Sequence, residues 1–243
     1  MPRPICATIH MGSLRHNLER MRRAAQGRTL WAVVKANAYG HGMLRAARAF
    51  ADADGLAMID LCDAKAVREA GWEKRILLIE GFFDETDLPV VENYHLETLV
   101  HNRRMIDMLK AHAPYKSIKV HIKINSGMNR LGFLPLEARM VKDELMSIPG
   151  VEVMGFVTHF ANAEPSYLSE NPSSVAKQLA RMGRLAQVEE NLCMANSAAL
   201  LFRSEVGGEA VRAGVALYGA SPDAKISSEE LGIKPAMTLS AKI

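Results

Sequence analysis

The sequence has few cysteines and no long apolar run. The three cysteines, Cys6, Cys62 and Cys193, show no paired spacing in a chain of 243 residues, which argues against a disulfide framework or a zinc site. No stretch approaches the roughly 20 apolar residues of a membrane-spanning helix, and the N-terminus lacks the apolar core of a signal peptide. We therefore expect a cytoplasmic protein with reduced thiols, no metal site and no membrane partner.

The sequence also has no excess of one charge. It contains 30 Lys and Arg residues against 27 Asp and Glu residues, so its formal net charge is only +3. The basic residues are scattered, which argues against a nucleic-acid partner. Hydrophobic residues make up 49% and charged residues 23%, as is usual for a globular protein, and the length suits one α/β barrel or two smaller domains.

Short apolar runs alternate with amphipathic stretches along most of the chain. This order favours parallel strands joined by helices, and eight such strands suit a TIM-type (β/α)8 barrel that we place at residues 11–232. The first helix has Ser13 as a candidate N-cap. The expected strands are 30–34, 55–59, 75–79, 96–100, 118–124, 151–158, 192–195 and 211–217, and the expected helices are 13–25, 43–53, 63–70, 87–94, 102–112, 136–147 and 174–190.

The two ends of the chain fall outside this repeat. Residues 1–10 and 233–243 each alternate between apolar and polar side chains, as a strand does. An exposed alternating strand is an adhesive edge that proteins normally cover. We therefore expect residues 1–10 to pair with a C-terminal β domain that these 243 residues do not include, and residues 233–243 to begin it.

One ten-residue stretch, V-V-K-A-N-A-Y-G-H-G at residues 33–42, carries the most chemical information. An apolar run places Lys35 at the end of an expected strand, and a tyrosine and two glycines lead into the next helix. A buried amine loses its proton more readily and can attack an aldehyde, while free backbone N–H groups nearby can hold a phosphate. Pyridoxal 5′-phosphate (PLP) has both groups. A lone lysine at a strand end, however, is more often a solvated cap.

The neighbouring residues favour the chemical interpretation, because this stretch closely resembles the PLP-lysine motif of the alanine racemase family. The chain is similar to that family's N-terminal barrel domain at four further motifs. Each of them follows or ends an expected barrel strand, where the functional groups of such a barrel lie. They are G-M-N-R-L-G at 127–132, T-H-F-A at 158–161, A-N-S-A-A at 195–199 and R-A-G-V-A-L-Y-G at 212–219.

The resemblance implies three catalytic residues. Lys35 would hold PLP as a Schiff base and exchange the Cα proton on one face of the substrate. Arg130 would contact the phenolic oxygen of the cofactor and the carboxylate of the substrate. His159 would pack against the pyridine ring. By themselves, an arginine in a barrel loop is more often a surface ion-pair partner, and a histidine after an apolar strand is more often a core residue.

Arg212 is implied to hydrogen-bond the pyridine nitrogen, although an arginine in an apolar strand could also be a solvated rim residue. A guanidinium keeps its proton, so the pyridine nitrogen stays unprotonated and PLP becomes a weaker electron sink. Brief removal and return of the Cα proton then becomes more favourable than transamination. Ala213 stands where the family commonly has proline, a change that removes no functional group.

The family's phosphate site and a modified lysine complete the expected set. Lys123 corresponds to a lysine that is carbamylated in many family members, or it is an outward-facing strand lysine. Ser197 could also be a plain helix N-cap. The residues implied to bind the phosphate are Tyr39, Asn196, Ser197, Gly214 and Val215.

The implied activity is the interconversion of L-alanine and D-alanine. It supplies D-alanine for peptidoglycan or takes part in the degradation of D-alanine. Family members are homodimers, and a tyrosine from the partner's C-terminal domain acts on the second face of the substrate. Of five tyrosines in this chain, only Tyr39 matches a functional residue, so we expect PLP binding with poor racemisation. The alternatives are a non-catalytic PLP-binding barrel of the PLP-homeostasis type, a racemase of broader specificity and a related decarboxylase.

Overall fold

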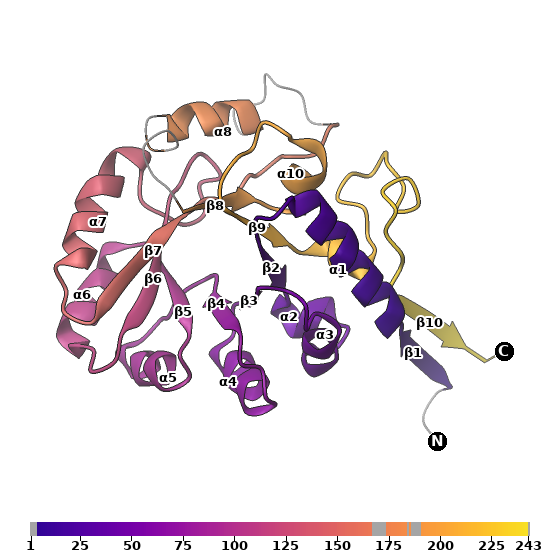
Figure 1. Ribbon diagram of the computed structural model, residues 1–243, viewed down its shortest axis with the longest axis horizontal. Helices are drawn as coiled ribbons and strands as arrows, with labels where there is room; N and C mark the ends of the chain where they lie inside the picture. The colour runs from indigo at the N-terminus through magenta and orange to yellow at the C-terminus, as the bar shows by residue number, and fades with distance from the viewer. Residues whose placement is uncertain (1–3, 167–173, 184, 186–190, 243) are drawn as a thin grey trace.

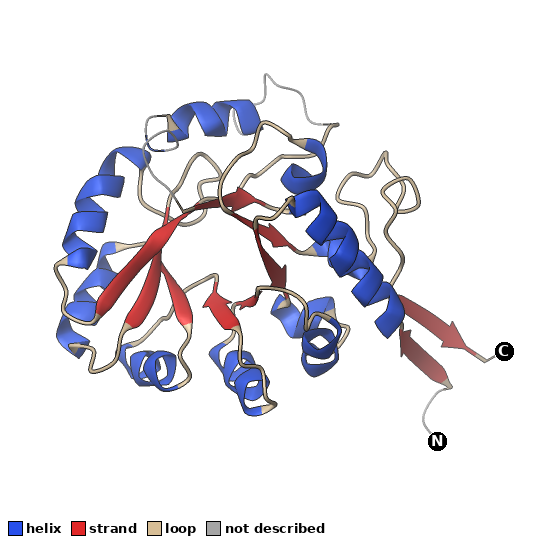
Figure 2. Cartoon of the chain, viewed as in Figure 1, coloured by secondary structure: helices blue, strands red, loops and turns tan. Residues whose placement is uncertain are grey.

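The computed structural model describes residues 4–166, 174–183, 185 and 191–242. Eight strands, β2 to β9 in chain order, form a closed barrel surrounded by helices (Figures 1 and 2). All neighbouring strands are parallel, and β2 closes the ring on β9 with Thr29 opposite Ala210 and Ala32 opposite Ala213. The expected (β/α)8 barrel is therefore confirmed.

The observed strands begin and end within a few residues of the expected ones. The barrel strands are β2 (Thr29–Val33), β3 (Gly55–Met58), β4 (Arg75–Leu78), β5 (Glu97–Val100), β6 (Ile118–Lys123), β7 (Val151–Val157), β8 (Leu192–Ala195) and β9 (Ala210–Ala213). The other elements are β1 (Ile5–Ile9), α1 (Met11–Ala25), α2 (Lys35–Tyr39), α3 (Met43–Ala49), α4 (Leu61–Glu69), η1 (Glu85–Asp87), α5 (Leu88–Asn93), α6 (Arg103–His112), η2 (Pro135–Glu137), α7 (Ala138–Met146), α8 (Val175–Met182), α10 (Ser197–Phe202), η3 (Val215–Tyr218) and β10 (Met237–Ala241).

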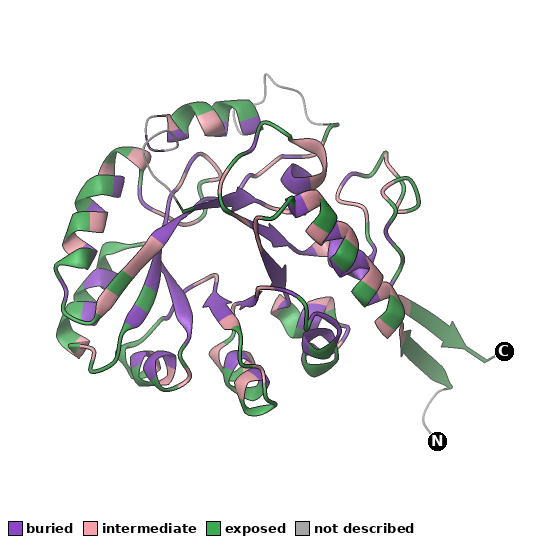
Figure 3. Cartoon of the chain, viewed as in Figure 1, coloured by how far each residue is buried: buried purple, intermediate pink, exposed green. Residues whose placement is uncertain are grey.

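The barrel strands are apolar on both faces because one face packs inside the ring and the other against the helices. Figure 3 shows the strands buried and the outer helix surfaces exposed. Most of the core lies between strands and helices. A second cluster fills the barrel interior and consists of Trp31, Val33, Ala57, Leu77, Leu99, Val157 and Cys193.

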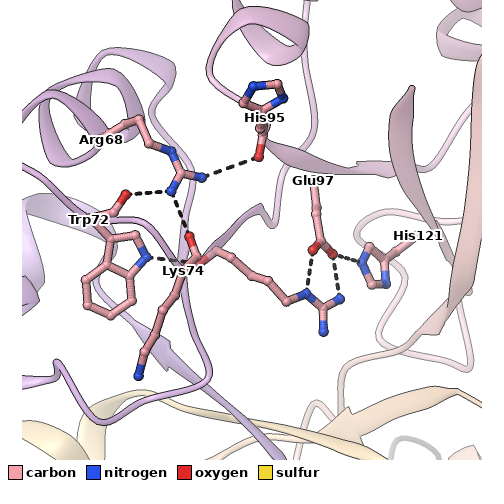
Figure 4. A network of polar contacts seen from close by, with 7 residues as sticks. Arg68, Trp72, Lys74, His95, Glu97 and His121 are labelled. Carbon is pink, nitrogen blue, oxygen red and sulfur yellow. Dashed lines mark hydrogen bonds and ion pairs between the residues drawn. The ribbon is translucent and has the colours of Figure 1, made fainter. Parts of the chain in front are cut away.

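An ion-pair network (Figure 4) lies at the N-terminal mouth of the barrel, where β4 and β5 begin. Glu97 on β5 is 3% exposed. One of its carboxylate oxygens accepts a hydrogen bond from Arg75 Nη2 at 2.7 Å and lies 2.7 Å from Nε2 of His121. The Arg75 guanidinium also lies over the ring of Trp31, 4.6 Å from its centroid. Polar side chains thus occupy this end of the barrel, whereas the functional groups of such barrels lie at the opposite end.

The two terminal strands pair with each other. β1 and β10 form an antiparallel ribbon in which Ile5 lies opposite Ala241 and Ile9 opposite Met237. The ribbon projects from the barrel beside α1, so both ends of the chain lie together (Figure 1). Its side chains are mainly exposed, with Leu239 at 72%. That this ribbon joins a further β domain remains a prediction.

Four expected boundaries are wrong. Helix α1 begins at Met11 with His10 as its N-cap, because Leu14 N already donates to His10 O, so Ser13 lies inside the first turn. The helix expected at 43–53 ends at Ala49, where Phe50 leaves the helical conformation. The strand expected at 211–217 ends at Ala213, because the chain turns at Gly214 into η3. The helix expected at 174–190 is observed at Val175–Met182, and residues 184 and 186–190 lie outside the described residues.

Candidate active site

A cavity of about 350 Å³ opens at the C-terminal ends of the barrel strands. It brings together residues from β2, β5, β6, β7 and β9 and from the segments that follow the strands, including those after β4 and β8. Every site residue named from the sequence lines it: Lys35, Tyr39, Lys123, Arg130, His159, Asn196, Ser197, Arg212, Gly214 and Val215. Their placement in one cavity is a finding, whereas their individual roles remain predictions.

Lys35 stands directly after β2, at the rim of the barrel, and is half-buried. Burial lowers the pKa of its amine, the positive charge of Arg130 lowers it further, and Glu80 opposes both. A lowered pKa means that more of the amine is unprotonated near neutral pH than for an ordinary lysine. The amine therefore has the property that nucleophilic attack requires.

The turn after Lys35 has an unusual backbone conformation. Ala36, Asn37, Ala38 and Tyr39 have φ values of 53°, 51°, 56° and 52°, so four consecutive residues adopt the left-handed helical conformation. The turn is closed by a hydrogen bond from Gly42 N to Asn37 O at 3.0 Å and by one from Met43 N to Asn37 Oδ1 at 2.8 Å. Left-handed geometry costs about 1–2 kcal/mol per residue with a side chain. Strain is therefore stored beside the candidate nucleophile.

Replacing Ala36 with glycine tests this strain. Ala36 is exposed, so the change removes the left-handed penalty without opening a cavity. The resulting gain in stability is partly offset by the greater conformational freedom of glycine in the unfolded chain. We expect Ala36→Gly to raise the free energy of unfolding by up to about 1 kcal/mol, measured by urea denaturation.

The matched control is Ala111→Gly in α6, an exposed alanine in a right-handed helix. This change should lower the stability by about 1 kcal/mol. An equal loss of unfolding free energy in Ala36→Gly and Ala111→Gly would contradict the left-handed conformation of Ala36.

An aromatic stack holds Tyr39 against the barrel. The rings of Tyr39 and His41 each lie 4.7 Å from the ring of Tyr218, and the Tyr218 hydroxyl donates to Val33 O at 2.9 Å. Burial raises the pKa of Tyr39, so its hydroxyl keeps its proton and remains a donor. A Cβ on Gly214 would lie 2.7 Å from the Tyr39 hydroxyl oxygen. Glycine is therefore needed where the chain passes this hydroxyl.

Tyr39, Ser197 and the turn at Gly214 form a concave set of donors. Ser197 Oγ accepts a hydrogen bond from Gly214 N at 2.8 Å, which leaves the hydroxyl proton of Ser197 free to donate. The helix N-cap is Asn196, whose Oδ1 accepts from Ala199 N at 2.9 Å, so the alternative that Ser197 is the cap is wrong. The first N–H groups of η3, beginning at Val215, have no acceptor within that helix. This donor set suits an anion such as a phosphate.

Arg212 is buried and rigidly held. Its Nη1 donates to Cys193 O at 2.6 Å and contacts Cys193 Sγ at 2.9 Å, and its Nη2 donates to Thr158 O at 2.6 Å. Nε has no hydrogen-bond partner among the described residues. The solvated rim position considered from the sequence is therefore wrong, and one fixed N–H remains available to a ligand.

His159 lies beside Arg212. Arg212 Nη2 donates to His159 Nδ1 across 3.3 Å, and because a guanidinium only donates, Nδ1 must be the acceptor. Burial lowers the pKa of His159 well below its usual range, and the positive charges of Arg212 and Lys123 add to this. The imidazole is therefore neutral at pH 7, with its proton on Nε2.

Lys123 ends β6 and points into the cavity, so the alternative of an outward-facing strand lysine is wrong. It is 7% exposed, and burial together with Arg212 and Arg130 lowers the pKa of its amine well below the usual value. No carboxylate among the described residues pairs with it. The cavity therefore contains a second buried amine that readily loses its proton.

Arg130 occupies the loop between β6 and η2. Asn125 Oδ1 accepts from Gly127 N and Asn129 N, both at 3.0 Å, and Gly132 turns with a φ of 119°. Arg130 itself is exposed and makes no hydrogen bond to another described residue. Its guanidinium is thus carried to the cavity by the loop and remains available to an anionic group.

Two polar residues of this region were not predicted from the sequence. Glu164 lines the cavity, and its Oε2 is the only buried side-chain oxygen or nitrogen without a hydrogen-bond partner among the described residues. Gln178 is fully buried behind the loops that carry Arg130 and His159. Glu164 could have been found as an acidic residue three positions after the T-H-F-A motif, whereas nothing in the sequence singles out Gln178.

The described residues hold no group of three or more His, Cys, Asp or Glu side chains that could bind a metal ion. Across the same part of the chain, no helix has the length and apolar character needed to cross a membrane. The donor set of the cavity is instead rich in cations and N–H groups, and a glycine leaves room at its concave side. It suits a small anionic ligand.

Comparisons with known proteins agree with this geometry. Residues 9–222 match the family described as "Alanine racemase, N-terminal domain". Over 247 residues the chain is 44% identical to an alanine racemase from Janthinobacterium sp. (strain Marseille), which covers 100% of this chain and 67% of that relative. An alanine racemase from Burkholderia mallei (strain SAVP1) is 41% identical over 245 residues, with the same coverage.

Solved structures are similarly close. Biosynthetic alanine racemase from Pseudomonas aeruginosa superposes with a TM-score of 0.90 at 36% identity, covering 98% of this chain and 66% of that one. Alanine racemase from Acinetobacter baumannii gives a TM-score of 0.91 at 33% identity, covering 100% and 67%. The chain thus spans about two thirds of the length of the relatives it matches.

Proposed function

The chain belongs to the alanine racemase family, and on that premise we propose that it binds PLP through Lys35 and takes part in the interconversion of L-alanine and D-alanine. The observation that carries this proposal is the position of Lys35. Its half-buried amine, with a lowered pKa, faces the same cavity as a fixed arginine N–H and a concave set of donors. These three features match the aldehyde, the ring nitrogen and the phosphate of PLP.

The residues present fit the cofactor on structural grounds. The Ser197 hydroxyl proton, the Tyr39 hydroxyl and the N–H groups at the start of η3 would hold the phosphate. Gly214 N already donates to Ser197 in this structure, so its direct contact with a phosphate requires that bond to be shared. The free Nε–H of Arg212 would meet the pyridine nitrogen. When bound, PLP supplies an electron sink that makes the Cα proton of an amino acid removable.

The remaining side chains have roles set by their charge. Neutral His159 would pack against the ring of the cofactor without adding a positive charge. Arg130 would bind the carboxylate of the amino acid and the phenolic oxygen of the cofactor, since its planar donors suit both. With PLP and the amino acid bound, the Lys35 amine would hold and return the Cα proton on one face.

We further propose that Lys123 is carbamylated. Its buried amine has a strongly lowered pKa and lies near two cations, Arg130 and Arg212. An unprotonated amine can attack CO₂, releasing one proton, and the resulting anion would neutralise part of this excess positive charge. The carbamate would then hold Arg130 in place, because Arg130 has no other hydrogen-bond partner among the described residues.

The second face of the substrate requires another proton donor and acceptor. Among the described residues, Tyr39 is the only tyrosine that lines the cavity, and its hydroxyl belongs to the proposed phosphate site. Tyr167 lies outside the described residues. We propose that the 243 residues by themselves supply one base, Lys35. The chain should therefore exchange the Cα proton of alanine faster than it inverts the configuration at Cα.

This proposal is tested by proton exchange in D₂O. The purified chain is incubated with PLP and with L-alanine or D-alanine, and deuterium at Cα and the enantiomer ratio are followed by NMR and chiral chromatography. We expect deuterium to enter one enantiomer at least about tenfold faster than that enantiomer inverts, since only one face has a base. Rapid inversion at the rate of exchange would contradict the one-base proposal, and no exchange with either enantiomer would contradict the proposed activity.

We propose a cellular role, a location and an assembly that accompany this activity. The activity would supply D-alanine for peptidoglycan or take part in the degradation of D-alanine. The three cysteines are free thiols, which suits the reducing cytoplasm. The exposed ribbon of β1 and β10 suits continuation into a C-terminal β domain and a homodimer in which the partner provides the second base.

A further inference from the structure

Helix α8 lies at the C-terminal rim of the barrel, between α7 and α10 (Figure 1). Its Gln178 points inward and is 0% exposed. Burying an amide is costly unless its hydrogen bonds are made. The partners of Gln178 are therefore informative about what this helix holds.

Gln178 bridges two loops of the cavity. Its Nε2 donates to Ser126 Oγ at 2.8 Å, in the loop after β6, and to His159 O at 3.0 Å, after β7. Its Oε1 accepts from Ala161 N at 2.9 Å. Because the Ala161 N–H can only donate, the amide has one orientation.

From Ser126 the hydrogen bonds continue to the ends of the strands in one direction. Thr158 Oγ1 donates its only proton to Ile124 O at 2.9 Å. In the contact between Ser126 Oγ and Thr158 Oγ1, at 2.7 Å, Ser126 is therefore the donor. The Thr158 carbonyl in turn accepts from Arg212 Nη2. One buried side chain thus connects the ends of β6 and β7 with the arginine at the floor of the cavity.

The loop that Gln178 holds is the one that carries Arg130. Ser126 is 1% exposed, its carbonyl accepts from Arg181 Nη1 at 3.3 Å, and Arg130 follows four residues later. Arg130 makes no hydrogen bond to another described residue, so its place relative to His159 depends on the backbone of this loop. Gln178 is the side chain that joins this loop directly to the backbone of His159.

We propose that Gln178 is a positioning residue that sets the separation of Arg130 and His159 across the cavity. It touches neither the cofactor nor the substrate and acts through Ser126, His159 O and Ala161 N. The inference rests on the proposed function where it concerns PLP, while the coupling of the two loops is a property of the protein itself.

Two substitutions test the proposal. Gln178→Leu removes all three hydrogen bonds, and Gln178→Glu keeps the shape and the acceptor for Ala161 but loses both donors when ionised. We expect each variant to raise the Kd for PLP by about tenfold, measured by absorbance titration. Without cofactor, each should accelerate amide hydrogen exchange in residues 125–133 and 159–161 relative to the barrel strands.

The matched control is Glu92→Leu. Glu92 is 1% exposed and lies outside the cavity, where it accepts from Tyr115 N and Lys116 N and pairs with His112, so its loss should lower Tm with little change in the Kd for PLP. An unchanged Kd in both Gln178 variants, unchanged loop exchange, or an equal rise in Kd for Glu92→Leu would overturn the proposal. If the unsubstituted chain does not bind PLP, the proposed function fails, and loop exchange alone then decides the role of Gln178.

Discussion

Lys35→Ala should abolish the covalent PLP adduct. With the unsubstituted chain we expect a yellow species that borohydride reduces to a stable secondary amine, and peptide mapping should locate it at Lys35. The variant should show no such adduct and should lose Cα exchange by at least about a thousandfold, since both the nucleophile and the base are gone. Absorbance spectra, intact mass after reduction and exchange in D₂O check these three results.

The sharpest control is the second buried amine of the cavity. Lys123 also has a strongly lowered pKa, so low pKa alone does not distinguish the two lysines. Lys123→Met should keep the adduct at Lys35, because it removes the amine proposed to be carbamylated and leaves the nucleophile in place. An adduct mapped to Lys123, or one that survives in Lys35→Ala, would contradict the assignment.

The pH dependence of adduct formation follows from the lowered pKa of Lys35. The rate depends on the unprotonated amine, so it should rise with pH and have its midpoint below 10.5, the ordinary pKa of lysine. Burial and Arg130 are the causes of this shift. Arg130→Ala should therefore move the midpoint of the rate profile to higher pH, and an unchanged midpoint would show that Arg130 does not act on Lys35.

Glu97→Ala should cause a large loss of stability. The substitution leaves Arg75 and His121 without their buried partner at the N-terminal mouth of the barrel (Figure 4). Breaking a buried pair costs about 3–5 kcal/mol, and because the Arg75 side chain is 40% exposed we expect the lower end of that range. For a chain of this length, about 3 kcal/mol corresponds to a fall in Tm of about 6–12 °C.

The same network predicts an acid-dependent loss of stability. Burial alone would raise the pKa of Glu97, but hydrogen bonds and charges from Arg75 and His121 outweigh it and lower the pKa from 4.5 to about 2. A carboxyl with a lowered pKa binds its proton less readily in the folded state. Its contribution of about 3 kcal/mol is therefore complete above pH 4.5 and is lost as the pH falls towards 2.

Urea denaturation between pH 2 and pH 7 measures this contribution. The difference in stability between the unsubstituted chain and Glu97→Ala should shrink as the pH falls below 4.5. Glu19→Gln is the control, because the Glu19 side chain is 67% exposed in its pair with Arg23 and should contribute less than about 1 kcal/mol. A difference between the two proteins that does not vary with pH would rule out Glu97 as the source of the acid dependence.

The convergence of the site residues was predictable from the sequence because of one property of parallel barrels. All strands point the same way, so residues that follow successive apolar runs meet at one rim. Lys35, Lys123, His159 and Asn196 each stand at or just after such a run, and the structure places them in one cavity. The order of strands followed from the alternation of apolar and amphipathic stretches in the same way.

Other features were not predictable because they depend on contacts between distant residues. The left-handed turn at 36–39 lacks the glycines that usually mark such geometry, and stacking of Tyr39 and His41 on Tyr218 supports it. Ser13 looked like an N-cap, but the turn before it was already closed by His10. The strand expected at 211–217 ends early because Gly214 must turn past Tyr39.

The barrel, the lysine at the end of its first strand and the set of cations around it could be predicted from the sequence, since strand periodicity and local motifs are encoded within short segments. How those cations act on one another depends on the folded arrangement. The pKa values of Lys35, Lys123 and His159 fall because folding buries them together. Arg212 has one free N–H because three neighbouring carbonyl groups, a thiol and His159 Nδ1 occupy the rest. Burial and distance arise when remote segments pack, and no segment carries either property alone.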